Sequence, residues 1–360
     1  MGKLAPLIMA LVASLALIPW TIVFAINGAG IEISGWVVDW NDSVLQKALQ
    51  SVSQSKNVLT EIDLFRFRLS PEGDVIATRP ITAKHRELLR VASEKRLRKL
   101  GTVVNDTVTS TGRTVKLKDG ALVHSILRTI PKQERLIAHI ITLARREELD
   151  GIDIDFENLD STDRGVFSQF LVTLGETLHA DGKSLVVTAH PQVDSRIRKG
   201  SGAQDLRAIA AVADEVRVMA YHYHYANTKP GSAAPIPWVE SIIKTAVHTV
   251  PPHKLTIAFY VGGWCWRQDA RSGKQISFQD AQELANTFGA MIEWDERDQV
   301  PFFLASSANN LAQVWFENSH SLLQKIRLIR KHRLRGIALW HLGKEDPTLY
   351  GELKLENSLQ

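Results

Sequence analysis

The sequence predicts an α/β fold, a (β/α)8 or TIM barrel with a small insertion between its seventh and eighth strands. Short apolar, β-branched segments alternate with longer amphipathic ones, and turn residues such as Gly101, Gly182 and Gly336 bound the short segments. A chain of 360 residues can supply eight such units around one core. A doubly wound sheet is the alternative, but the chain lacks the glycine-rich phosphate loop typical of dinucleotide-binding sheets and also lacks a P-loop.

Eight strands and seven intervening helices follow from this reading. The predicted strands are residues 33–38, 62–67, 102–105, 151–156, 185–189, 215–221, 255–261 and 336–340. The predicted helices are residues 43–53, 83–100, 132–147, 162–180, 203–211, 238–247 and 321–332. In the third of these helices, Leu136, Ile140 and Ala144 recur at helical spacing on one face. Strands that alternate with helices in this way favour a parallel sheet.

Residues 267–316 are too long for a simple connection between the last two strands. They contain a helix-like segment at 278–288 and short apolar segments at 290–294 and 300–305. We expect an insertion here, on the loop that follows the seventh strand, which is the side where such barrels keep their active sites. The barrel itself is expected over residues 31–350, with a tail at 351–360.

The N-terminal segment, residues 1–30, is not expected to belong to the barrel. Lys3 precedes a nearly uninterrupted apolar run over residues 4–26, which is typical of an export signal or of an uncleaved signal anchor. Both alternatives remain open. We therefore expect an exported protein that is secreted, periplasmic or tethered to the outer face of the membrane by this run.

Composition excludes several classes of function. With 43 Lys and Arg against 39 Asp and Glu, the net charge of +4 gives no sign of nucleic-acid binding. Cys265 is the single cysteine, so an intrachain disulfide and a cysteine-based zinc or iron–sulfur site are excluded. We expect a monomer that requires no cofactor and no metal.

The segment DGIDIDFE, residues 150–157, carries the clearest chemical signal. Side chains alternate between the two faces of a strand, so Asp153, Asp155 and Glu157 share one face and the apolar residues between them share the other. In a barrel the outer face is covered by helices, so the carboxylates must point into the interior. A calcium loop is disfavoured because the spacers are bulky and apolar.

Three carboxylates in a barrel interior should perturb one another's ionisation. Their mutual repulsion is expected to raise at least one pKa, and the three groups should titrate as a coupled set. A carboxyl group with a raised pKa can serve as a general acid near neutral pH.

The segment resembles the strand-four signature of glycoside hydrolase family 18, the chitinase and endo-N-acetylglucosaminidase family. Its four acidic positions and its glycine all match. Further strands are similar in order: GWVVDW at 35–40, VMAY at 218–221, KLTIAFY at 254–260 and GIALW at 336–340. The segments at 301–303, 314–317 and 342–347 look most like the spore-germination and cortex-lytic branch.

The resemblance implies a substrate-assisted mechanism, an exception to the usual two-carboxylate scheme. Glu157 would protonate the leaving oxygen, and Asp155 would orient the N-acetyl group that attacks the anomeric carbon. Asp153 would share a proton with Asp155. Tyr221 would hydrogen-bond the acetamido oxygen, and Trp340 would form the apolar floor beneath it.

Two positions depart from the family pattern. His222 stands where the family usually has an aspartate after the strand-six tyrosine, and it could hold the sugar, tune the pH optimum or indicate a changed substrate. Asn105 ends a third strand that lacks the usual Ser-x-Gly-Gly, and it could contact substrate or make a strand-end hydrogen bond.

Further substrate contacts are expected from aromatic side chains near strand ends and from matched motif positions. Sugar rings stack on aromatic faces, although core packing is the alternative for any tryptophan. The additional predicted contacts are Asp150, Trp36, Met219, Tyr260 and Trp264.

Two other classes of function are weighed against the glycosidase. A metal-dependent hydrolase could use a set of ligands drawn from His190, His222, His224, His341 and Asp346, but it would leave the acidic row unexplained. A sugar-binding, lectin-like barrel is the other alternative, although such relatives typically lack the glutamate that Glu157 provides. We therefore predict a retaining glycosidase that cleaves β-linked glycans containing N-acetylglucosamine, with peptidoglycan favoured over chitin.

Overall fold

The architecture is a closed barrel of eight parallel strands. The computed structural model describes residues 30–193, 198–307 and 310–358; the apolar run at 4–26 lies outside them. Neighbouring strands pair in the order β1-β2-β4-β6-β7-β8-β9-β15, and β15 pairs with β1 to close the ring. The predicted (β/α)8 barrel is confirmed, and each of its eight strands overlaps a predicted one.

The helices and strands have the following bounds. The barrel strands are β1 (Glu32–Val38), β2 (Glu61–Leu69), β4 (Arg98–Val108), β6 (Gly151–Asp155), β7 (Ser184–Ala189), β8 (Glu215–Met219), β9 (Leu255–Tyr260) and β15 (Gly336–Trp340). Two short strands, β3 (Val75–Ala77) and β5 (Thr114–Lys116), pair antiparallel with β2 and β4 respectively. The helices are α1 (Asp42–Gln54), α2 (Ala83–Glu94), α3 (Gly120–Leu127), α4 (Ile130–Arg146), α5 (Arg164–Ala180), α6 (Arg198–Ser201), α7 (Leu206–Val212), α8 (Ile236–Ala246), α9 (Phe278–Phe288), α10 (Ser319–Lys331) and α11 (Leu349–Ser358).

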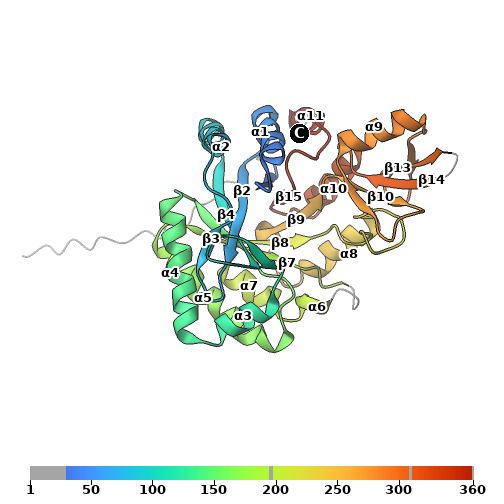
Figure 1. The fold of residues 1–360 in the computed structure, drawn as a ribbon. Helices are drawn as coiled ribbons and strands as arrows, with labels where there is room; N and C mark the ends of the chain where they lie inside the picture. The colour runs from blue at the N-terminus through green and yellow to red at the C-terminus, as the bar shows by residue number, and fades with distance from the viewer. Residues whose placement is uncertain (1–29, 194–197, 308–309, 359–360) are drawn as a thin grey trace, which may run out of the picture. The chain divides into compact units, whose positions relative to one another are not determined.

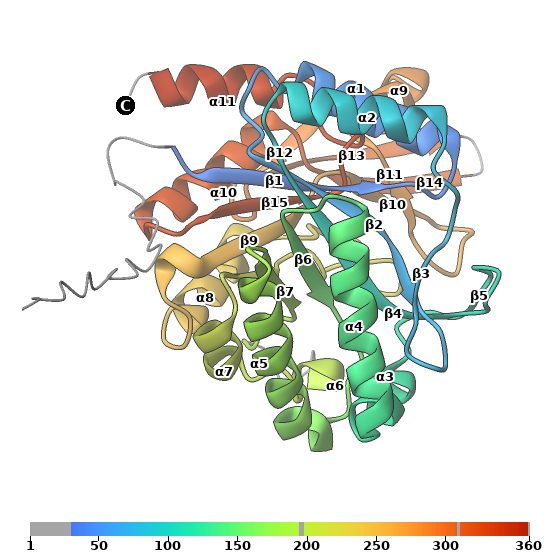
Figure 2. The same cartoon turned by 90° about the vertical axis from the view of Figure 1, so that its left-hand side faces the viewer.

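The helices cover the outside of the barrel, as Figure 2 shows for α4, α5 and α7. Strand β6 illustrates why apolar side chains face the helices and polar side chains face the barrel interior. Ile152, Ile154 and Phe156 are fully buried on the outer face, and Phe156 lies 6.3 Å between ring centroids from each of Phe167 and Phe170 on α5. Burial of these apolar side chains turns the alternate carboxylates inward.

Helix α2 is shorter than the sequence predicts. The expected helix at 83–100 ends at Glu94, because Arg96 adopts a left-handed backbone conformation with φ of 56° and the chain then enters β4 at Arg98. Left-handed residues commonly end helices, but glycine usually occupies such positions. The boundary was therefore not visible in the residue types.

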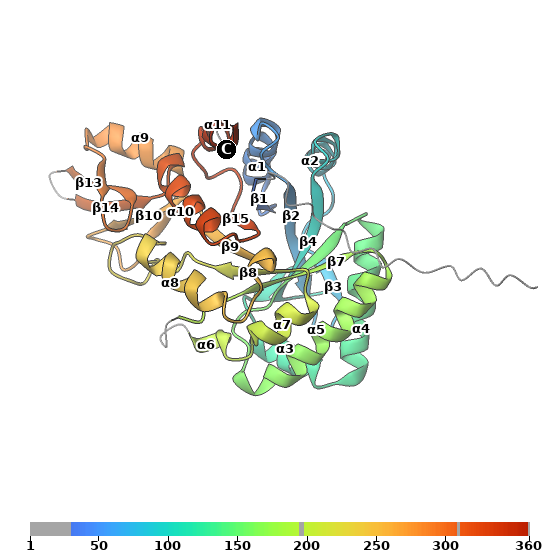
Figure 3. The same cartoon turned by 180° about the vertical axis from the view of Figure 1, so that it is seen from behind.

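The chain between β9 and β15 forms a second, antiparallel sheet. Its strand order is β11-β10-β14-β13-β12, with bounds β10 (Gly263–Arg267), β11 (Lys274–Ile276), β12 (Glu293–Asp295), β13 (Val300–Ser307) and β14 (Asn310–Phe316). Helix α9 packs on this sheet through Ala281 and Ala285, which meet Phe303 and Phe316. The sheet and α9 lie to one side of the barrel, near α8 and α10 (Figures 1 and 3).

Within the ranges that the structure describes, none of the helices combines the length and the apolar character needed to cross a membrane.

A buried cluster of charges occupies the barrel interior. The guanidinium of Arg217, on β8, is fully buried. It contacts two carboxylates on β2 and one on its own strand. Its Nη1 lies 2.7 Å from Asp63, its Nε lies 2.8 Å from Glu215, and its Nη2 pairs with Glu61. Burial raises the pKa of Asp63 well above its usual value and that of Glu61 to about 7, although Arg217 opposes both shifts. Arg217 therefore offsets much of the cost of burying these acids.

We expect Arg217→Met to destabilise the fold by about 3–5 kcal/mol, because it leaves three buried carboxylates without their shared cation. Urea unfolding measures the change. The matched control is Arg145→Met, which removes an exposed pair with Asp181 and should leave the free energy of unfolding nearly unchanged. Equal losses in the two variants would contradict this role for Arg217.

Candidate active site

The acidic row begins on β6 and continues into the residues that follow it. Asp153 is fully buried, whereas Asp155 and Glu157 are 8% and 7% exposed nearer the barrel mouth. The alternation of β6 thus places three carboxylates in a line that runs from the core toward solvent. Each has a different set of partners, and these partners determine what each can do.

Asp153 is held in place by three hydrogen-bond donors. Its Oδ2 accepts from Trp36 Nε1 at 3.2 Å and from Thr102 Oγ1 at 3.1 Å, and its Oδ1 accepts from Thr188 Oγ1 at 2.9 Å. Burial raises the pKa of Asp153, while Arg217 and these donors oppose the shift. The side chain is therefore fixed in orientation as a hydrogen-bond acceptor.

Asp155 is the carboxyl group best suited to hold a proton. Burial raises its pKa well above the usual value, and the neighbouring charges of Glu157 and Asp153 raise it further. Its Oδ1 has no hydrogen-bond partner in the described part of the chain. The expectation that at least one pKa in the row is raised is thus supported by its surroundings.

Glu157 is positioned by contacts to its side chain and to its backbone. Its Oε1 lies 2.6 Å from Lys118 Nζ, and its Oε2 lies 3.4 Å from His190 Nε2. The Asn105 amide brackets its backbone: Nδ2 donates to Glu157 O at 2.7 Å, and Glu157 N donates to Oδ1 at 2.9 Å. Glu157 is therefore held at the mouth from both neighbouring strands, by Lys118 and Asn105 from the side of β4 and by His190 after β7.

The pKa of Glu157 is shifted in the opposite direction to that of Asp155. Burial alone would raise it, but the charge of Lys118, with a smaller contribution from His190, holds the pKa of Glu157 below its usual value. The resting site therefore favours an ionised Glu157 beside an Asp155 that favours the protonated form. The row alone did not predict this division, because it arises from Lys118.

A cavity of about 320 Å³ opens over the acidic row. Asp155, Glu157 and Trp340 line it together with Arg68 and Lys118. Trp340 is half-buried and is braced edge-on by Trp36 and Phe65, at centroid distances of 5.6 and 4.7 Å. One aromatic face and two carboxyl groups thus meet in one space large enough for a sugar.

The structure brings several other predicted residues beneath this cavity. Tyr221, Met219 and Tyr260 are buried in one interior cluster with Trp36, and Trp264 packs at its edge. Burial, with the charge of Asp155 next, raises the pKa of Tyr221 well above its usual value, so its hydroxyl keeps its proton. Direct substrate contact by Tyr221, Met219, Tyr260 and Trp264 stays a prediction.

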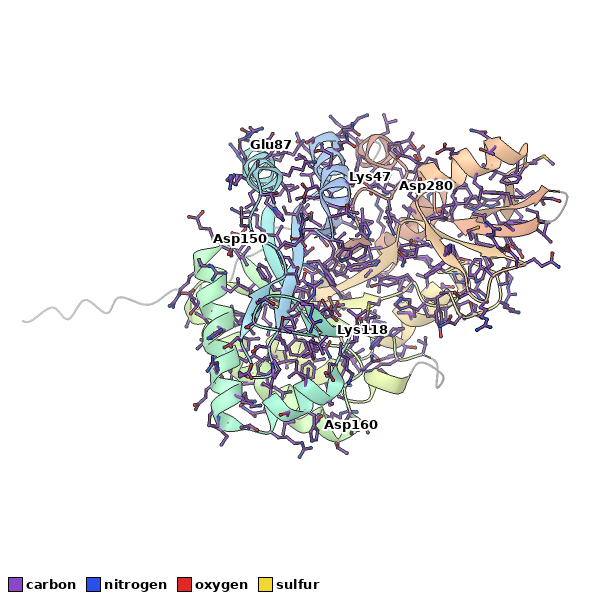
Figure 4. The ribbon with its side chains drawn as sticks, viewed as in Figure 1. Lys47, Glu87, Lys118, Asp150, Asp160 and Asp280 are labelled. Atoms are coloured by element: carbon purple, nitrogen blue, oxygen red, sulfur yellow. The ribbon has the colours of Figure 1, made fainter. Side chains whose placement is uncertain are left out.

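Three residues predicted to contact substrate have other partners in the structure, and their contact with substrate stays a prediction. Asp150 precedes β6, at the end of the barrel opposite the mouth, where it accepts from Lys99 N at 2.7 Å; Figure 4 shows it well apart from Lys118. Trp36 is 1% exposed, and its indole N–H donates to Asp153. Asn105 is 1% exposed, and both ends of its amide are engaged by the backbone of Glu157. Trp36 and Asn105 therefore position groups of the acidic row, and Asn105 also lines the catalytic cavity.

The histidines of the metal hypothesis do not gather. The described residues contain no group of three or more His, Cys, Asp or Glu side chains arranged to hold a metal ion. His222 instead lies with its ring 4.6 Å from that of Tyr221, and burial, with the charge of Lys118 next, lowers its pKa to about 4. His222 is therefore neutral near pH 7, and its contact with substrate stays a prediction.

Sequence reasoning missed Lys118 and Arg68, and it considered His190 only as a metal ligand. Lys118 follows the short strand β5, and its φ of 48° together with a hydrogen bond from its backbone N to Asp106 Oδ1 at 2.9 Å fixes the loop beside Glu157. The surrounding residues carry no motif that singles out this lysine. Only the closure of the barrel shows which loop reaches the mouth.

The family of the chain follows from comparison with known proteins. The model for glycosyl hydrolases family 18 matches residues 123–345, which include the acidic row, Tyr221 and Trp340. The chain belongs to family 18. Because this match covers more than half of the chain and agrees with the closed barrel and its acidic row, the protein is a glycosidase.

Named relatives place the chain within the family. It is 27% identical over 328 residues to the cortical fragment-lytic enzyme of Bacillus subtilis, covering 88% of this chain and 72% of that one. The crystal structure of the spore cortex-lytic enzyme SleL of Bacillus megaterium has a TM-score of 0.81 and 25% identity, over 92% of this chain and 75% of that one. A chitinase from Chromobacterium violaceum shares the fold, with a TM-score of 0.80 and 24% identity over 92% of this chain and all of that one. The chain spans between 55% and 72% of the length of the first four curated relatives.

The charge of Lys118 should set the alkaline limit of this family 18 site. A general acid works when protonated, so kcat/KM falls as pH rises through the pKa of Glu157. Because Lys118 lowers that pKa, Lys118→Met should move the fall to higher pH. The pH profile on a chromogenic chito-oligosaccharide measures it. Lys116→Met, which removes the neighbouring pair with Asp119, is the control and should leave the profile in place.

Asn105 should act on catalysis through Glu157. Asn105→Ala removes both hydrogen bonds to the Glu157 backbone, and we expect kcat to fall by about 10- to 100-fold because the carboxyl group loses its fixed position. KM should change less than threefold if the side chain does not touch substrate. A rise in KM with unchanged kcat would restore the substrate-contact reading.

Proposed function

We propose that this protein is a retaining glycosidase that cleaves β-linked glycans containing N-acetylglucosamine by substrate-assisted catalysis. The observation that carries the proposal is the meeting of Asp155, Glu157 and Trp340 in one cavity at the mouth of a family 18 barrel. Trp340 provides an apolar surface beneath the sugar in subsite −1. The carboxyl groups of Asp155 and Glu157 line the same cavity and can act on the glycosidic bond of that sugar.

In the proposed reaction, Glu157 donates a proton to the glycosidic oxygen as the bond to the anomeric carbon breaks. The carbonyl oxygen of the substrate's own N-acetyl group forms the new bond to that carbon, which gives an oxazolinium ion. Asp155 accepts a hydrogen bond from the acetamido N–H, and Tyr221 donates to the acetamido oxygen. Water, deprotonated by Glu157, then opens the ring from the face of the departed group, so the configuration is retained.

The opposed pKa values of Asp155 and Glu157 suit this scheme. The proton favoured on Asp155 lies next to the carboxylate of Glu157, which needs a proton before it can act as an acid. Substrate that draws Lys118 away from Glu157 would remove the charge that keeps its pKa low. Glu157 would then hold the proton at the moment when the leaving oxygen requires it.

Peptidoglycan is the proposed natural polymer, and export is the proposed route to it. The named relatives include enzymes that act on spore cortex and on its fragments, and a chitinase. The apolar run at 4–26 fits a protein that is exported or tethered at the outer face of the membrane.

Glu157→Gln should lower the rate of hydrolysis by about 10²- to 10⁴-fold, because the amide cannot donate the acidic proton. Binding of the sugar should survive. The assay measures release from a chromogenic chito-oligosaccharide and from purified peptidoglycan, with EDTA present and absent. Glu283→Gln, on the exposed face of α9, is the matched control.

Two outcomes would contradict the proposal. Loss of activity in EDTA would favour a metal-dependent reaction instead. Oligosaccharide binding by the wild type without any hydrolysis of either substrate would favour the lectin-like alternative, and the substitution of His222 for the usual aspartate would then be the first suspect.

A further inference from the structure

A second cavity, of about 520 Å³, lies outside the catalytic one. The loop that follows β8 forms one wall, through His222, His224 and Lys229, and helix α8 contributes Trp238. Arg297 and Asp298, from the turn between β12 and β13 of the second sheet, complete it. Among the residues of this cavity, the sequence analysis named His222 as a substrate contact and His224 as a candidate metal ligand.

This cavity lies on the side of Glu157 opposite the catalytic cavity. Around the barrel the strands run β4, β6, β7, β8, so the loops after β4 and after β8 flank the end of β6 from opposite directions. The catalytic cavity uses Asn105 and Lys118 from the β4 side, whereas the second cavity uses the β8 side. If the sugar of subsite −1 lies over Trp340, the second cavity is a place into which the leaving group can extend.

The charges of the second cavity favour an anion. Lys229 and Arg297 are exposed, and neither forms an ion pair with a carboxylate in the described residues. Asp298 is the acidic residue in the lining, and burial, with the neighbouring charge of Asp295 next, raises its pKa. His222 and His224 both have lowered pKa values through burial, so they add little positive charge near pH 7. The lining of the second cavity thus holds two cationic side chains and one carboxyl group.

Polar atoms of the same wall also lack partners. Trp238 is 8% exposed, and its indole N–H has no hydrogen-bond partner in the described part of the chain. Nδ1 of His224 is likewise unpartnered there. Buried polar groups are nearly always satisfied, so these two unpaired atoms mark a wall whose polar groups are not all satisfied within the described residues.

We propose that the second cavity is a leaving-group subsite for a sugar that carries a carboxylate, which Lys229 and Arg297 recognise. This inference rests on the proposed function. In peptidoglycan strands that have lost their peptides, a carboxylated N-acetylhexosamine alternates with N-acetylglucosamine and presents such a group next to the bond that is cut. The proposal therefore selects glycans with free carboxylates over uncharged chitin.

The test compares three substrates: peptide-free peptidoglycan glycan strands, the same strands with their carboxylates converted to neutral amides, and a chromogenic chito-oligosaccharide. Lys229→Gln/Arg297→Gln should lower kcat/KM on the native strands by about tenfold, as expected for loss of charge-assisted hydrogen bonds. On the two neutral substrates it should change kcat/KM less than twofold. The matched control is Arg86→Gln/Lys354→Gln, which removes the same net charge from exposed positions on α2 and α11.

The wild type supplies a readout that needs no variant. It should cleave native strands faster than amidated strands, and the preference should shrink as salt rises. Equal rates on both, or an equal loss on all three substrates in the double variant, would overturn the subsite. Cleavage of the chito-oligosaccharide alone would overturn it while the proposed function survives, whereas no cleavage of any substrate would overturn both.

Discussion

The cost of burying carboxylates inside the barrel is the constraint on which the site depends. An ionised carboxylate away from water requires donors or a cation. Arg217 meets this need for Asp63, Glu61 and Glu215 in the core, and three neutral donors meet it for Asp153. Asp155 has an unpartnered Oδ1, and the charge of Lys118 only partly opposes burial and the neighbouring carboxylates, so its pKa is raised.

The row therefore has a graded set of environments rather than three equivalent acids. Asp153 is locked as an acceptor, Asp155 favours the proton, and Glu157 is kept ionised by a lysine from a different strand connection. Two residues of spacing along one strand separate each group from the next, and the charges of Glu157 and Asp153 both raise the pKa of Asp155. The fold supplies this arrangement because β6 lies between donors on β4 and β7.

The sequence predicted the barrel and the row because both depend on local periodicity. Alternation along β6 was enough to place Asp153, Asp155 and Glu157 on the interior face, and the strands of the barrel all appear where apolar segments predict them. The end of α2 at Arg96 and the loop of Lys118 were missed because both depend on left-handed residues that are not glycine. The sequence allowed Asn105 a substrate contact or a strand-end hydrogen bond, and the structure shows its hydrogen bonds to the Glu157 backbone. The hydrogen bond from Trp36 to Asp153 was not predicted. Such cross-barrel contacts join residues far apart in the chain and leave no spacing pattern.

Net charge describes this protein poorly, because its cations have different partners. The overall balance of +4 includes Arg217, whose charge is matched in the core, and Lys118, whose charge is matched by Glu157. Lys229 and Arg297 differ from these because they face a cavity without a paired carboxylate in the described residues. A substrate senses the local field in a cleft rather than the sum over the chain. On this proposal, selectivity for an anionic glycan depends on the place where the loop after β8 meets the turn between β12 and β13, which carries Arg297.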